Sequence, residues 1–479
     1  MASDQQPCSR IVVIGAGLAG LAAAEALASL AAVRVTVIES AGRHGGVLGT
    51  VRRDGWLVER SADCFLAARP EGIDLVARLG LTDELLGVDP RVRRALVWHE
   101  GRALPVPRGF RLLAPGRVGG VLATPLLSPW GRLRLLGERF VPVRSAAADD
   151  DESLQQFAVR RLGREAFERL VQPLAAGIWT ADPARLSMAA ACPEFLAMER
   201  DQGSLWAGER RRLAGQADAA EATGARYGQF VTFAGGMETL PARLIEHLRE
   251  RGVEFMPATA ARLRPLPGRG WEIDLAAPAA APLSAAAVVV ATSARGAAAL
   301  IGEVDAPLAA DLAAIEYAGS AIVSLGFARE QVAHPLDAAG LVVPRRAGRR
   351  ILAVSFSSSK FPGRAPPGCV LMRVFVGGAL DPQVLRLGDD ALVEVALHEV
   401  GDLLGARGTP RLAQVDRWES AMPQYHLGHA ARVVRIAEAA QRHAGLALAG
   451  AAYTGVGIPQ VIASGRAAAC SVAAAITTG

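Results

Sequence analysis

The first forty residues constrain the fold of this chain more than any other stretch. An apolar run at residues 11–14 leads into a glycine-rich turn, an Ala/Leu-rich segment covers residues 21–30, and a second apolar run at residues 35–38 ends at Glu39. The turn consists of Gly15, Ala16, Gly17, Leu18, Ala19 and Gly20. A strand, a GxGxxG turn, a helix and a strand with a terminal acid form the context in which this pattern indicates a Rossmann-type dinucleotide site.

Each glycine of the pattern has a physical task. Gly15 permits the tight turn, Gly17 lets the backbone approach a pyrophosphate, and Gly20 lets the helix pack closely on the strand. We expect the phosphates at the positive N-terminal end of that helix. Glu39 is placed to accept hydrogen bonds from an adenosine ribose.

The residues after Glu39 decide which dinucleotide binds. Arg43 and the pair Gly45 and Gly46 complete an ExxxRxGG pattern. An NAD site has no use for a second glycine pair here, whereas FAD enzymes of the glutathione-reductase type resemble this arrangement closely. The alternative, an Ala/Gly-rich segment without a ligand, leaves Glu39 and Arg43 unexplained. We therefore predict FAD as the cofactor.

Size and charge limit the class of protein. With 479 residues the chain is too long for one ordinary core and suggests two or three domains. The net charge of +5 is carried almost wholly by arginine, because Lys360 is the sole lysine. No short block concentrates basic residues with aromatics between them, so nucleic-acid binding is disfavoured.

Cysteine usage and apolar windows indicate a reducing compartment and no spanning helix. The five cysteines are far apart, odd in number and without a CxxC, which argues against a disulfide framework or structural zinc. The polar N-terminus MASDQQPCSR has no apolar signal core and is interpreted as a short lead-in to the first strand. No window of about 18 apolar residues is free of charge, so only interfacial membrane association stays open.

Residues 110–140 differ in composition from the rest. Leucine, proline and arginine dominate, with Trp130 and almost no acid before Glu138. Two interpretations stay open: a segment lying on an anionic membrane surface, or helices packed on a neighbouring domain with arginine heads outward.

The following stretch predicts a helical core and a connector. Residues 149–152 are acidic and are expected to start a helix. Apolar residues then recur at helical intervals typical of a core, at Leu154, Phe157, Leu162, Phe167, Leu170 and Leu174. The polar, Ala-rich residues 203–226 are the best candidate for a connector.

The tail repeats the combination of glycines and a helix. Gly455 and Gly457 stand just before Pro459 and a helix predicted over residues 464–476. A helix N-terminus aimed at a flavin would stabilise the negative charge of its reduced form. Ordinary loop-to-helix chemistry explains these residues almost as well.

Beyond the glycine motifs the chain resembles, nearly end to end, the oxygen-dependent protoporphyrinogen/coproporphyrinogen oxidases of haem synthesis. The stretches that carry this resemblance are residues 151–163, 172–179, 182–188, 233–236, 360–362, 377–378, 422–429 and 455–459. Among them are Gly-Ile-Trp ending at Trp179, Lys-Phe-Pro from Lys360 and Met-Pro-Gln-Tyr ending at Tyr425. These are far more particular to the family than the FAD motifs, which many flavoenzymes share.

The resemblance implies an α/β molecule with a Rossmann-like FAD-binding domain of glutathione-reductase type, an α+β substrate domain and a helical domain that in this family can rest on a membrane. The FAD-binding domain would comprise residues 1–95, 221–295 and 416–479. Residues 96–220 would form the helical, membrane-associating and substrate region. Residues 296–415 would form the substrate-binding domain.

The resemblance also implies which residues meet the ligands. FAD contacts would come from Gly15, Ala16, Gly17, Leu18, Ala19, Gly20, Glu39, Ser40, Arg43, Gly46, Val47, Ser61, Ala62, Asp63, Cys64, Ala260, Trp418, Val456, Gly457 and Ile458. Substrate contacts would come from Arg94, Asp63, Phe356 and Val342, with Arg94 matching an arginine that reaches a propionate. The alternatives are a surface arginine for Arg94, with Arg91 and Arg93 as equal competitors, and apolar core for Phe356 and Val342.

The implied reaction is the six-electron oxidation of protoporphyrinogen IX to protoporphyrin IX, with O2 as acceptor and release of hydrogen peroxide. No side chain is predicted to be catalytic, because hydride passes to flavin N5 while the protein positions the ring and excludes water. Arginine suits the propionates, since it binds carboxylates in a forked geometry. Asp63 is a candidate acceptor for ring N–H groups. No metal site is predicted, because His44, His99, His426 and His429 have no metal-ligand spacing.

Alternatives to this function stay open. Coproporphyrinogen III, with four propionates instead of two, is the alternative substrate. Another FAD amine-oxidase or desaturase-like enzyme and an inactive FAD-bound scaffold are the other candidates. The expected location is the cytoplasm, with peripheral contact at the cytoplasmic face of a membrane, a homodimer and hand-over of product to a ferrochelatase left open.

The chain departs from the family pattern in three places. Ser61 and Ala62 stand where relatives usually have Gly-Pro, Cys64 replaces a small serine, and Gln460 and Val461 stand where Asp-Cys is common. These loops put substrate choice and activity in question more than FAD binding.

Overall fold

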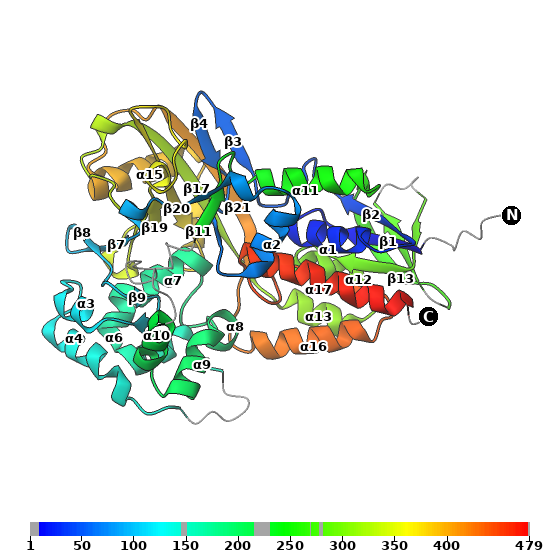
Figure 1. The fold of residues 1–479 in the computed structure, drawn as a ribbon, viewed down its shortest axis with the longest axis horizontal. Coiled ribbons are helices and arrows are strands. Elements are labelled where there is room, and N and C mark those ends of the chain that lie inside the picture. Colours follow the sequence, from blue (N-terminus) through cyan, green and yellow to red (C-terminus); the bar gives the residue numbers. More distant parts are fainter. Residues whose placement is uncertain (1–8, 145–150, 215–229, 269, 277–280, 478–479) are drawn as a thin grey trace.

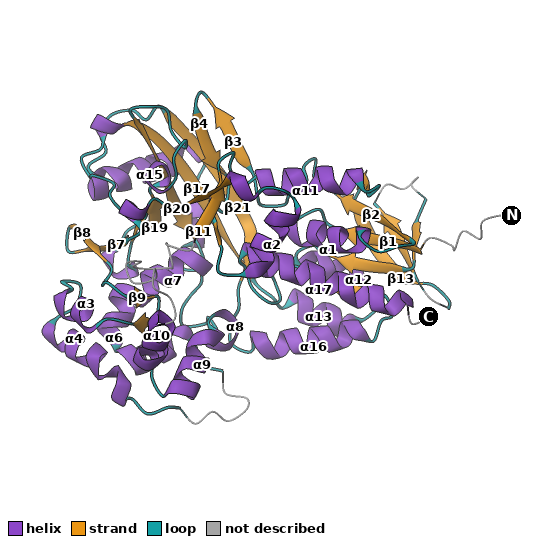
Figure 2. Ribbon diagram, viewed as in Figure 1, coloured by secondary structure: helices purple, strands orange, loops and turns teal. Residues whose placement is uncertain are grey.

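The computed structural model describes residues 9–144, 151–214, 230–268, 270–276 and 281–477 (Figure 1). A five-stranded sheet with its helices lies at the right of the view, a seven-stranded sheet at the upper left, and a group of short helices at the lower left (Figure 2). The mixed α/β class predicted from the sequence is confirmed. The predicted lead-in covers residues 1–10; residues 1–8 lie outside the described residues, and Ser9 and Arg10 already belong to the first strand.

The five-stranded sheet is parallel throughout, in the order β12-β2-β1-β16-β22. Its strands are β1 (Ser9–Ile14), β2 (Val33–Glu39), β12 (Glu254–Pro257), β16 (Ala287–Val290) and β22 (Leu446–Leu448). Ile11 and Val13 face one apolar core, whereas Val12 and Ile14 face another. Burial on both faces explains why these strands are continuous apolar runs in the sequence. The sheet therefore joins three stretches that are far apart in the chain.

Helices cover both faces of this sheet. On one face lie α1 (Leu18–Ala28), α2 (Pro70–Arg78), α11 (Thr239–Glu250) and α17 (Ile458–Thr477). On the other lie α12 (Ala294–Ile301), α13 (Ala306–Ala313), α16 (His429–Gln441) and the antiparallel strands β13 (Ala260–Pro265), β14 (Trp271–Leu275) and β15 (Leu283–Ala285). A side chain at Gly465 of α17 would collide with the carbonyl oxygen of Ala19 in α1. Glycine is thus what lets these two helices pack so closely.

The seven-stranded sheet has the order β21-β17-β20-β19-β18-β7-β8. Its strands are β7 (Ala95–His99), β8 (Arg102–Pro105), β17 (Tyr317–Ala328), β18 (Gly340–Val342), β19 (Ile351–Ser355), β20 (Cys369–Gly377) and β21 (Leu412–Pro423). All neighbours are antiparallel except β18 and β7. Helix α15 (Asp389–Leu404) packs on one face. Strands β7 and β21 cross the predicted boundaries at residues 95 and 416, so this sheet recruits chain from outside the predicted substrate domain.

The other face of the seven-stranded sheet shares a core with the short helices. They are α3 (Val118–Ala123), α4 (Pro129–Leu136), α5 (Leu154–Leu162), α6 (Arg164–Ala166), α7 (Gln172–Trp179), α8 (Met188–Ala191), α9 (Pro193–Gln202) and α10 (Leu205–Ala214). All six apolar residues that recur at helical intervals after residue 153 lie in this core, as predicted. Helix α5 begins with a capping box, in which Ser153 and Gln156 exchange side-chain and backbone hydrogen bonds.

Short elements link these layers. They are β3 (Thr50–Arg53), β4 (Trp56–Glu59), β5 (Phe65–Leu66), β6 (Leu85–Gly87), β9 (Phe110–Arg111), β10 (Ala114–Pro115), β11 (Phe230–Phe233) and α14 (Ser357–Lys360). Among the described residues no helix combines the length and apolarity that crossing a membrane requires.

Before β7, Pro90–Val92 forms a short helical turn capped by Asp89, and the strand begins only at Ala95. One local prediction differs from the structure. The predicted connector, residues 203–226, contains helix α10 up to Ala214, and its remainder lies outside the described residues. The acids at residues 149 and 150 of the predicted helix start also lie outside them.

Candidate cofactor and substrate site

The first glycine turn connects β1 to α1 at the carboxyl end of the parallel sheet. Gly15 has a φ of +105°, and a Cβ atom there would lie 2.8 Å from the carbonyl oxygen of Ala291. A side chain at Gly20 would collide with the Gly15 carbonyl oxygen. Gly17 precedes the first residue of α1, Leu18, and has no side chain to cap the first-turn amides. These N–H groups are therefore left for an anionic ligand.

The second glycine loop lies directly against the first. The Gly45 N–H donates to the Ala16 carbonyl at 2.8 Å. Gly46 has a φ of +60°, and a Cβ atom there would lie 3.0 Å from the Cα of Gly17. The Arg43 guanidinium donates to the carbonyls of Gly46 and Leu48. Arg43 thus holds the loop in place from within the chain, and the exposed Val47 follows it.

Glu39 closes the turn from the end of β2. Its Oε2 accepts from the Ala16 N–H at 2.7 Å and its Oε1 from the Ala41 N–H at 2.8 Å. Each carboxylate oxygen has a second lone pair, so acceptor capacity remains for ribose hydroxyls. Exposed Ser40 lies beside it, and Pro257 of β12 pairs with Glu39 just before Ala260 begins β13.

Ser61, Ala62, Asp63 and Cys64 link the glycine loops to the seven-stranded sheet. The Ser61 hydroxyl donates to the Val47 carbonyl at 2.7 Å, and the Arg373 guanidinium of β20 donates to the Ser61 carbonyl. The Trp418 indole N–H of β21 donates to the Arg60 carbonyl at 2.8 Å. The predicted contact Trp418 therefore lies against the start of this loop.

Asp63 is the centre of a buried charge cluster. Its Oδ2 accepts from Lys360 Nζ at 2.6 Å and from the Ser355 hydroxyl at 3.4 Å, and it lies 3.3 Å from Arg373. Burial by itself would raise the pKa of Asp63, but the Lys360 and Arg373 cations outweigh it and hold the pKa of this carboxyl well below its usual range. Asp63 is therefore a carboxylate throughout the neutral range.

Cys64, the residue after Asp63, is another position of this loop at which the chain departs from the family pattern. Its thiol donates to Asp63 Oδ1 at 3.2 Å. Burial, with the adjacent Asp63 charge, raises the pKa of this thiol well above its usual range. Cys64 thus stays protonated and acts as a weak donor.

The tail bridges two cores. Val456 packs against the core of the seven-stranded sheet and short helices, whereas Ile458, the first residue of α17, belongs to a core of the parallel sheet. The Gln460 side chain folds back over the turn. A Cβ atom on Gly455 would lie only 2.7 Å from Gln460 Cγ. A side chain at Gly457 would collide with it too. The Gln460 side chain therefore occupies the space beside both glycines.

The predicted substrate residues occupy different environments. The Arg94 guanidinium donates to the side chain and the carbonyl of Asp337 and is 43% exposed. Val342 of β18 is 7% exposed, in the core shared with the short helices. Phe356 is fully buried on the α15 side of the sheet, 5.7 Å from the His334 ring. Arg94 is thus accessible, whereas Phe356 offers no exposed surface.

These residues fit a dinucleotide. The two glycine loops meet where a Cβ on Gly46 would lie 3.0 Å from the Gly17 Cα, an uncapped helix N-terminus adjoins them, and Glu39 retains acceptor capacity. These residues fit FAD, because the second glycine loop and Ser61 extend the dinucleotide site toward the seven-stranded sheet. Sequence reasoning missed the clamp of Lys360, Arg373 and Ser355 on Asp63. The one signal for it was that Lys360 is the chain's only lysine.

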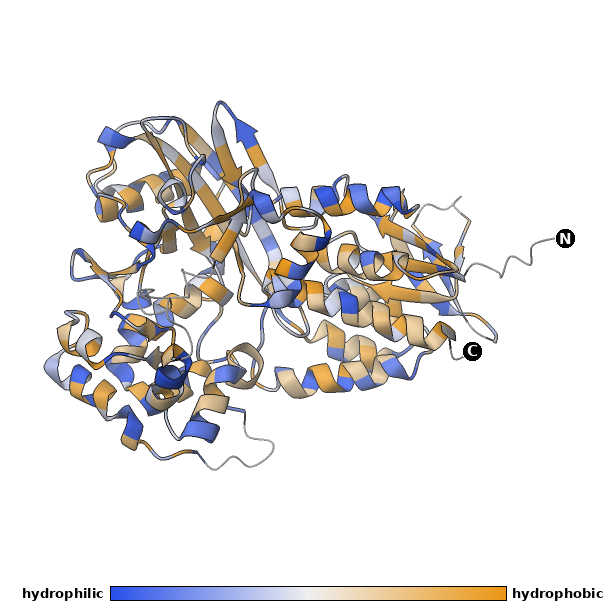
Figure 3. Ribbon diagram, viewed as in Figure 1, coloured by the Kyte–Doolittle hydropathy of each residue, from blue (hydrophilic) through white to orange (hydrophobic). Residues whose placement is uncertain are grey.

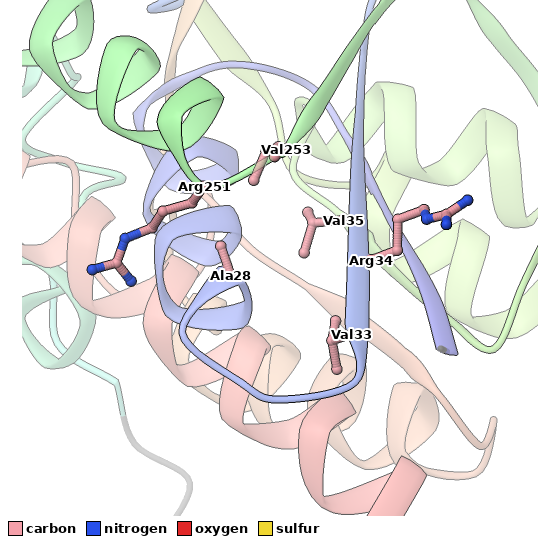
Figure 4. Close-up of a pocket in the computed structure, with 7 residues that line it drawn as sticks. Ala28, Val33, Arg34, Val35, Arg251 and Val253 are labelled. Carbon is pink, nitrogen blue, oxygen red and sulfur yellow. The ribbon is translucent and has the colours of Figure 1, made fainter. Parts of the chain in front are cut away.

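A pocket of about 200 Å³ lies at the opposite edge of the parallel sheet, where β2 and β12 begin. It is lined by Ala28, Val33, Arg34, Val35, Arg251, Gly252 and Val253. Arg34 and Arg251 point away from each other, so no cations converge in it (Figure 4). Ligands of open α/β sheets bind at the carboxyl ends of the strands, where the glycine loops lie.

Comparisons with known proteins agree with this geometry. The family model described as flavin containing amine oxidoreductase matches residues 18–473. The chain is 31% identical to coproporphyrinogen III oxidase of Bacillus subtilis, covering 96% of each chain. It is 34% identical to coproporphyrinogen III oxidase of Propionibacterium freudenreichii, covering 97% of this chain and 90% of the relative. A crystal structure from Exiguobacterium sp. 255-15, provisionally named a protoporphyrinogen oxidase, superposes with a TM-score of 0.83 at 27% identity, covering 97% of this chain and 98% of that one.

Proposed function

This chain belongs to the family of flavin-containing amine oxidoreductases, and from that premise we propose that it is an FAD-dependent porphyrinogen oxidase of haem synthesis. The observation that carries the proposal is full-length similarity to two named porphyrinogen oxidases at 31% and 34% identity. The contact between the two glycine loops supports the same cofactor. FAD, when bound, supplies the acceptor for hydride from the reduced macrocycle, and O2 is the final acceptor with release of hydrogen peroxide.

The chain's own residues bind and orient the reactants. The N-terminal amides of α1 and Glu39 hold the dinucleotide, and Arg43 keeps the second glycine loop closed over it. Arg94 binds a propionate. Its two hydrogen bonds to Asp337 leave three of the five guanidinium N–H groups for a carboxylate. Val342 shapes the wall on which the ring rests, and Phe356 supports the same sheet from its α15 side without touching the ring.

Two substrates fit this proposal. The sequence predicts protoporphyrinogen IX, and the provisional name of the Exiguobacterium structure agrees with it. Coproporphyrinogen III is the second candidate, because the two relatives described above, at 31% and 34% identity, are both named for that substrate. Coproporphyrinogen III carries two more propionates than protoporphyrinogen IX. The number of arginines around the substrate site therefore decides between them.

We also infer which part of the fold binds FAD, which binds the substrate and which contacts a membrane. The parallel sheet and its helices form the FAD domain, and the seven-stranded sheet forms the substrate domain. The short helices rest on an anionic membrane surface. Figure 3 colours the ribbon by hydropathy and shows hydrophobic residues along the short helices. Support for the membrane contact is a set of large apolar side chains exposed on α3, α4, the turn at Gly137–Phe140 and the residues just after it. They are Val118, Leu122, Trp130, Leu133, Phe140 and Val143, with Trp130 80% and Phe140 74% exposed.

Turnover in air tests the function. The protein is purified as expressed, its visible flavin spectrum is recorded, and porphyrin fluorescence and hydrogen peroxide are followed with each porphyrinogen in turn. We expect porphyrin to form from at least one of them. An amine oxidase would leave both porphyrinogens unoxidised but release peroxide with an amine, and a scaffold would bind flavin without any turnover.

Vesicle flotation tests the membrane contact. The wild type is expected to float with vesicles of anionic phospholipid, and the double variant Trp130→Ser, Phe140→Ser to stay behind with unchanged oxidase activity. Leu30→Ser is the control, since Leu30 is 40% exposed on the parallel-sheet side. Equal flotation of all three proteins would refute the contact. A homodimer and hand-over of product to a ferrochelatase are separate proposals. Analytical ultracentrifugation tests both associations.

A further inference from the structure

The only lysine of the chain is buried at the junction between the glycine loops and the seven-stranded sheet. Lys360 ends α14 and its side chain is 7% exposed. It donates to Asp63 Oδ2 at 2.6 Å and to the Ser355 hydroxyl at 3.2 Å. All other basic residues of Lys/Arg type, 51 of 52, are arginine. In a chain so strongly biased toward arginine, a buried lysine points to a site whose geometry requires it.

The geometry explains why arginine does not fit there. Arg373, 1% exposed, already places a planar guanidinium beside Asp63 Oδ2 and also binds the Ser61 carbonyl. The second cation binds that same oxygen and the Ser355 hydroxyl, and it lies over the Phe361 ring, 5.3 Å from the ring centre. An ammonium is a compact point charge with rotatable donors, whereas a guanidinium is a rigid planar fork.

The two oxygens of Asp63 are therefore not equivalent. Oδ2 receives Lys360, Ser355 and the Arg373 charge, whereas Oδ1 accepts from the Cys64 thiol at 3.2 Å, a weak donor. Asp63 is also the most exposed charged group of the cluster, at 12% against 7% for Lys360 and 1% for Arg373. A ligand can thus reach Asp63 more readily than either cation.

We propose that Lys360 is a positioning residue that fixes the Asp63 carboxylate so that Oδ1 accepts an N–H of the tetrapyrrole substrate. The inference rests on the proposed function, which supplies that class of ligand. Ser61 transmits the same constraint to the second glycine loop through its bond to the Val47 carbonyl, so ring and cofactor are aligned by one network. Lys360 acts through Asp63 and does not itself touch the ring.

Binding of the oxidised porphyrin to the FAD-loaded protein tests the proposal without turnover. The shift of the porphyrin absorption band is titrated for wild type, Lys360→Met, Lys360→Arg and Asp63→Asn. We expect about tenfold weaker binding for each single variant, equivalent to about 1.4 kcal/mol. The FAD content should stay at the wild-type level, and the porphyrinogen KM should rise more than kcat falls.

A double-mutant cycle separates positioning from a merely structural role. If Lys360 acts through Asp63, Lys360→Met should have almost no further effect in the Asp63→Asn protein. Additive losses, or wild-type porphyrin affinity in Lys360→Met or Lys360→Arg, would overturn the proposal. Ser355→Ala is the milder variant should Lys360→Met fold poorly. We expect about threefold weaker porphyrin binding from the loss of one hydrogen bond. Unchanged binding in Ser355→Ala would count against the role of Lys360 and Ser355 in fixing Asp63.

The wild type distinguishes the two levels of inference. A wild-type protein that neither oxidises a porphyrinogen nor binds porphyrin contradicts the proposed function. A wild-type protein that does both, together with an unaffected Lys360→Met variant, contradicts only the role of Lys360.

Discussion

Gly46 lies against Gly17, so close that a Cβ atom on Gly46 would be 3.0 Å from the Gly17 Cα. Gly46 comes from the second glycine motif and Gly17 from the first. The two motifs, read separately in the sequence, therefore form one backbone surface. Because Gly46 also has a φ of +60°, any side chain there is strained as well as crowded.

The first prediction concerns this contact. Gly46→Ala should bind FAD about tenfold more weakly, equivalent to about 1.4 kcal/mol, because its methyl group displaces the first loop. Fluorescence titration of the FAD-free protein with FAD measures this. Gly42→Ala is the matched control in the same loop, since a Cβ there meets no atom within 4 Å. Equal affinities of the two variants would show that the loop contact is irrelevant to the cofactor.

The second prediction concerns Arg94. Arg94→Ala should raise the porphyrinogen KM about tenfold through loss of one charge-assisted carboxylate contact, with FAD content unchanged. Steady-state kinetics and the flavin spectrum measure the two quantities. Arg91→Ala is the control, because Arg91 is 87% exposed and pairs with Asp89. Loss of FAD in Arg94→Ala would rule out the assignment.

The third prediction concerns stability in the short helices. Arg161 and Glu138 form an ion pair with no exposed side-chain surface, and the Glu138 carboxylate also accepts from the Leu205 N–H. Arg161→Met should lower the free energy of unfolding by about 3–5 kcal/mol, because it leaves a buried carboxylate unpaired. Arg164→Met, which breaks an exposed pair with Glu168, should cost about 0.5 kcal/mol. Denaturant unfolding monitored by tryptophan fluorescence compares the two.

The fourth prediction concerns acid sensitivity. His429 is 1% exposed and stacks on Tyr425 at 4.2 Å, and burial, aided by Arg432, lowers its pKa from 6.5 to about 4. Between these two pH values the unfolded chain binds a proton that the folded chain does not. This contribution to stability is therefore complete above pH 6.5 and is lost as the pH falls toward 4, by up to about 3 kcal/mol.

His429→Phe keeps a stacking ring but removes the proton site. Its free energy of unfolding should fall less steeply between pH 6.5 and 4 than that of the wild type. His398→Phe, at a side chain that is 73% exposed, is the control and should retain the wild-type slope. If His429→Phe also retains it, another group is responsible for the acid sensitivity.

The sequence by itself determined the parallel sheet and its cofactor motifs. Strands such as β1 and β16 are apolar runs buried on both faces, and the glycines of the turn have tasks that local geometry dictates. Such patterns depend on near neighbours in the chain, so they can be read without coordinates.

Only the tertiary structure decided the surroundings of the substrate residues. Asp63 and Lys360 are 297 residues apart, and nothing in their local sequence shows that they form an ion pair. Likewise Arg94 binds Asp337, 243 residues away, and Phe356 is buried on the α15 side of the sheet. Long-range pairing is set by how separate sheets pack against one another, and that packing depends on the whole chain at once.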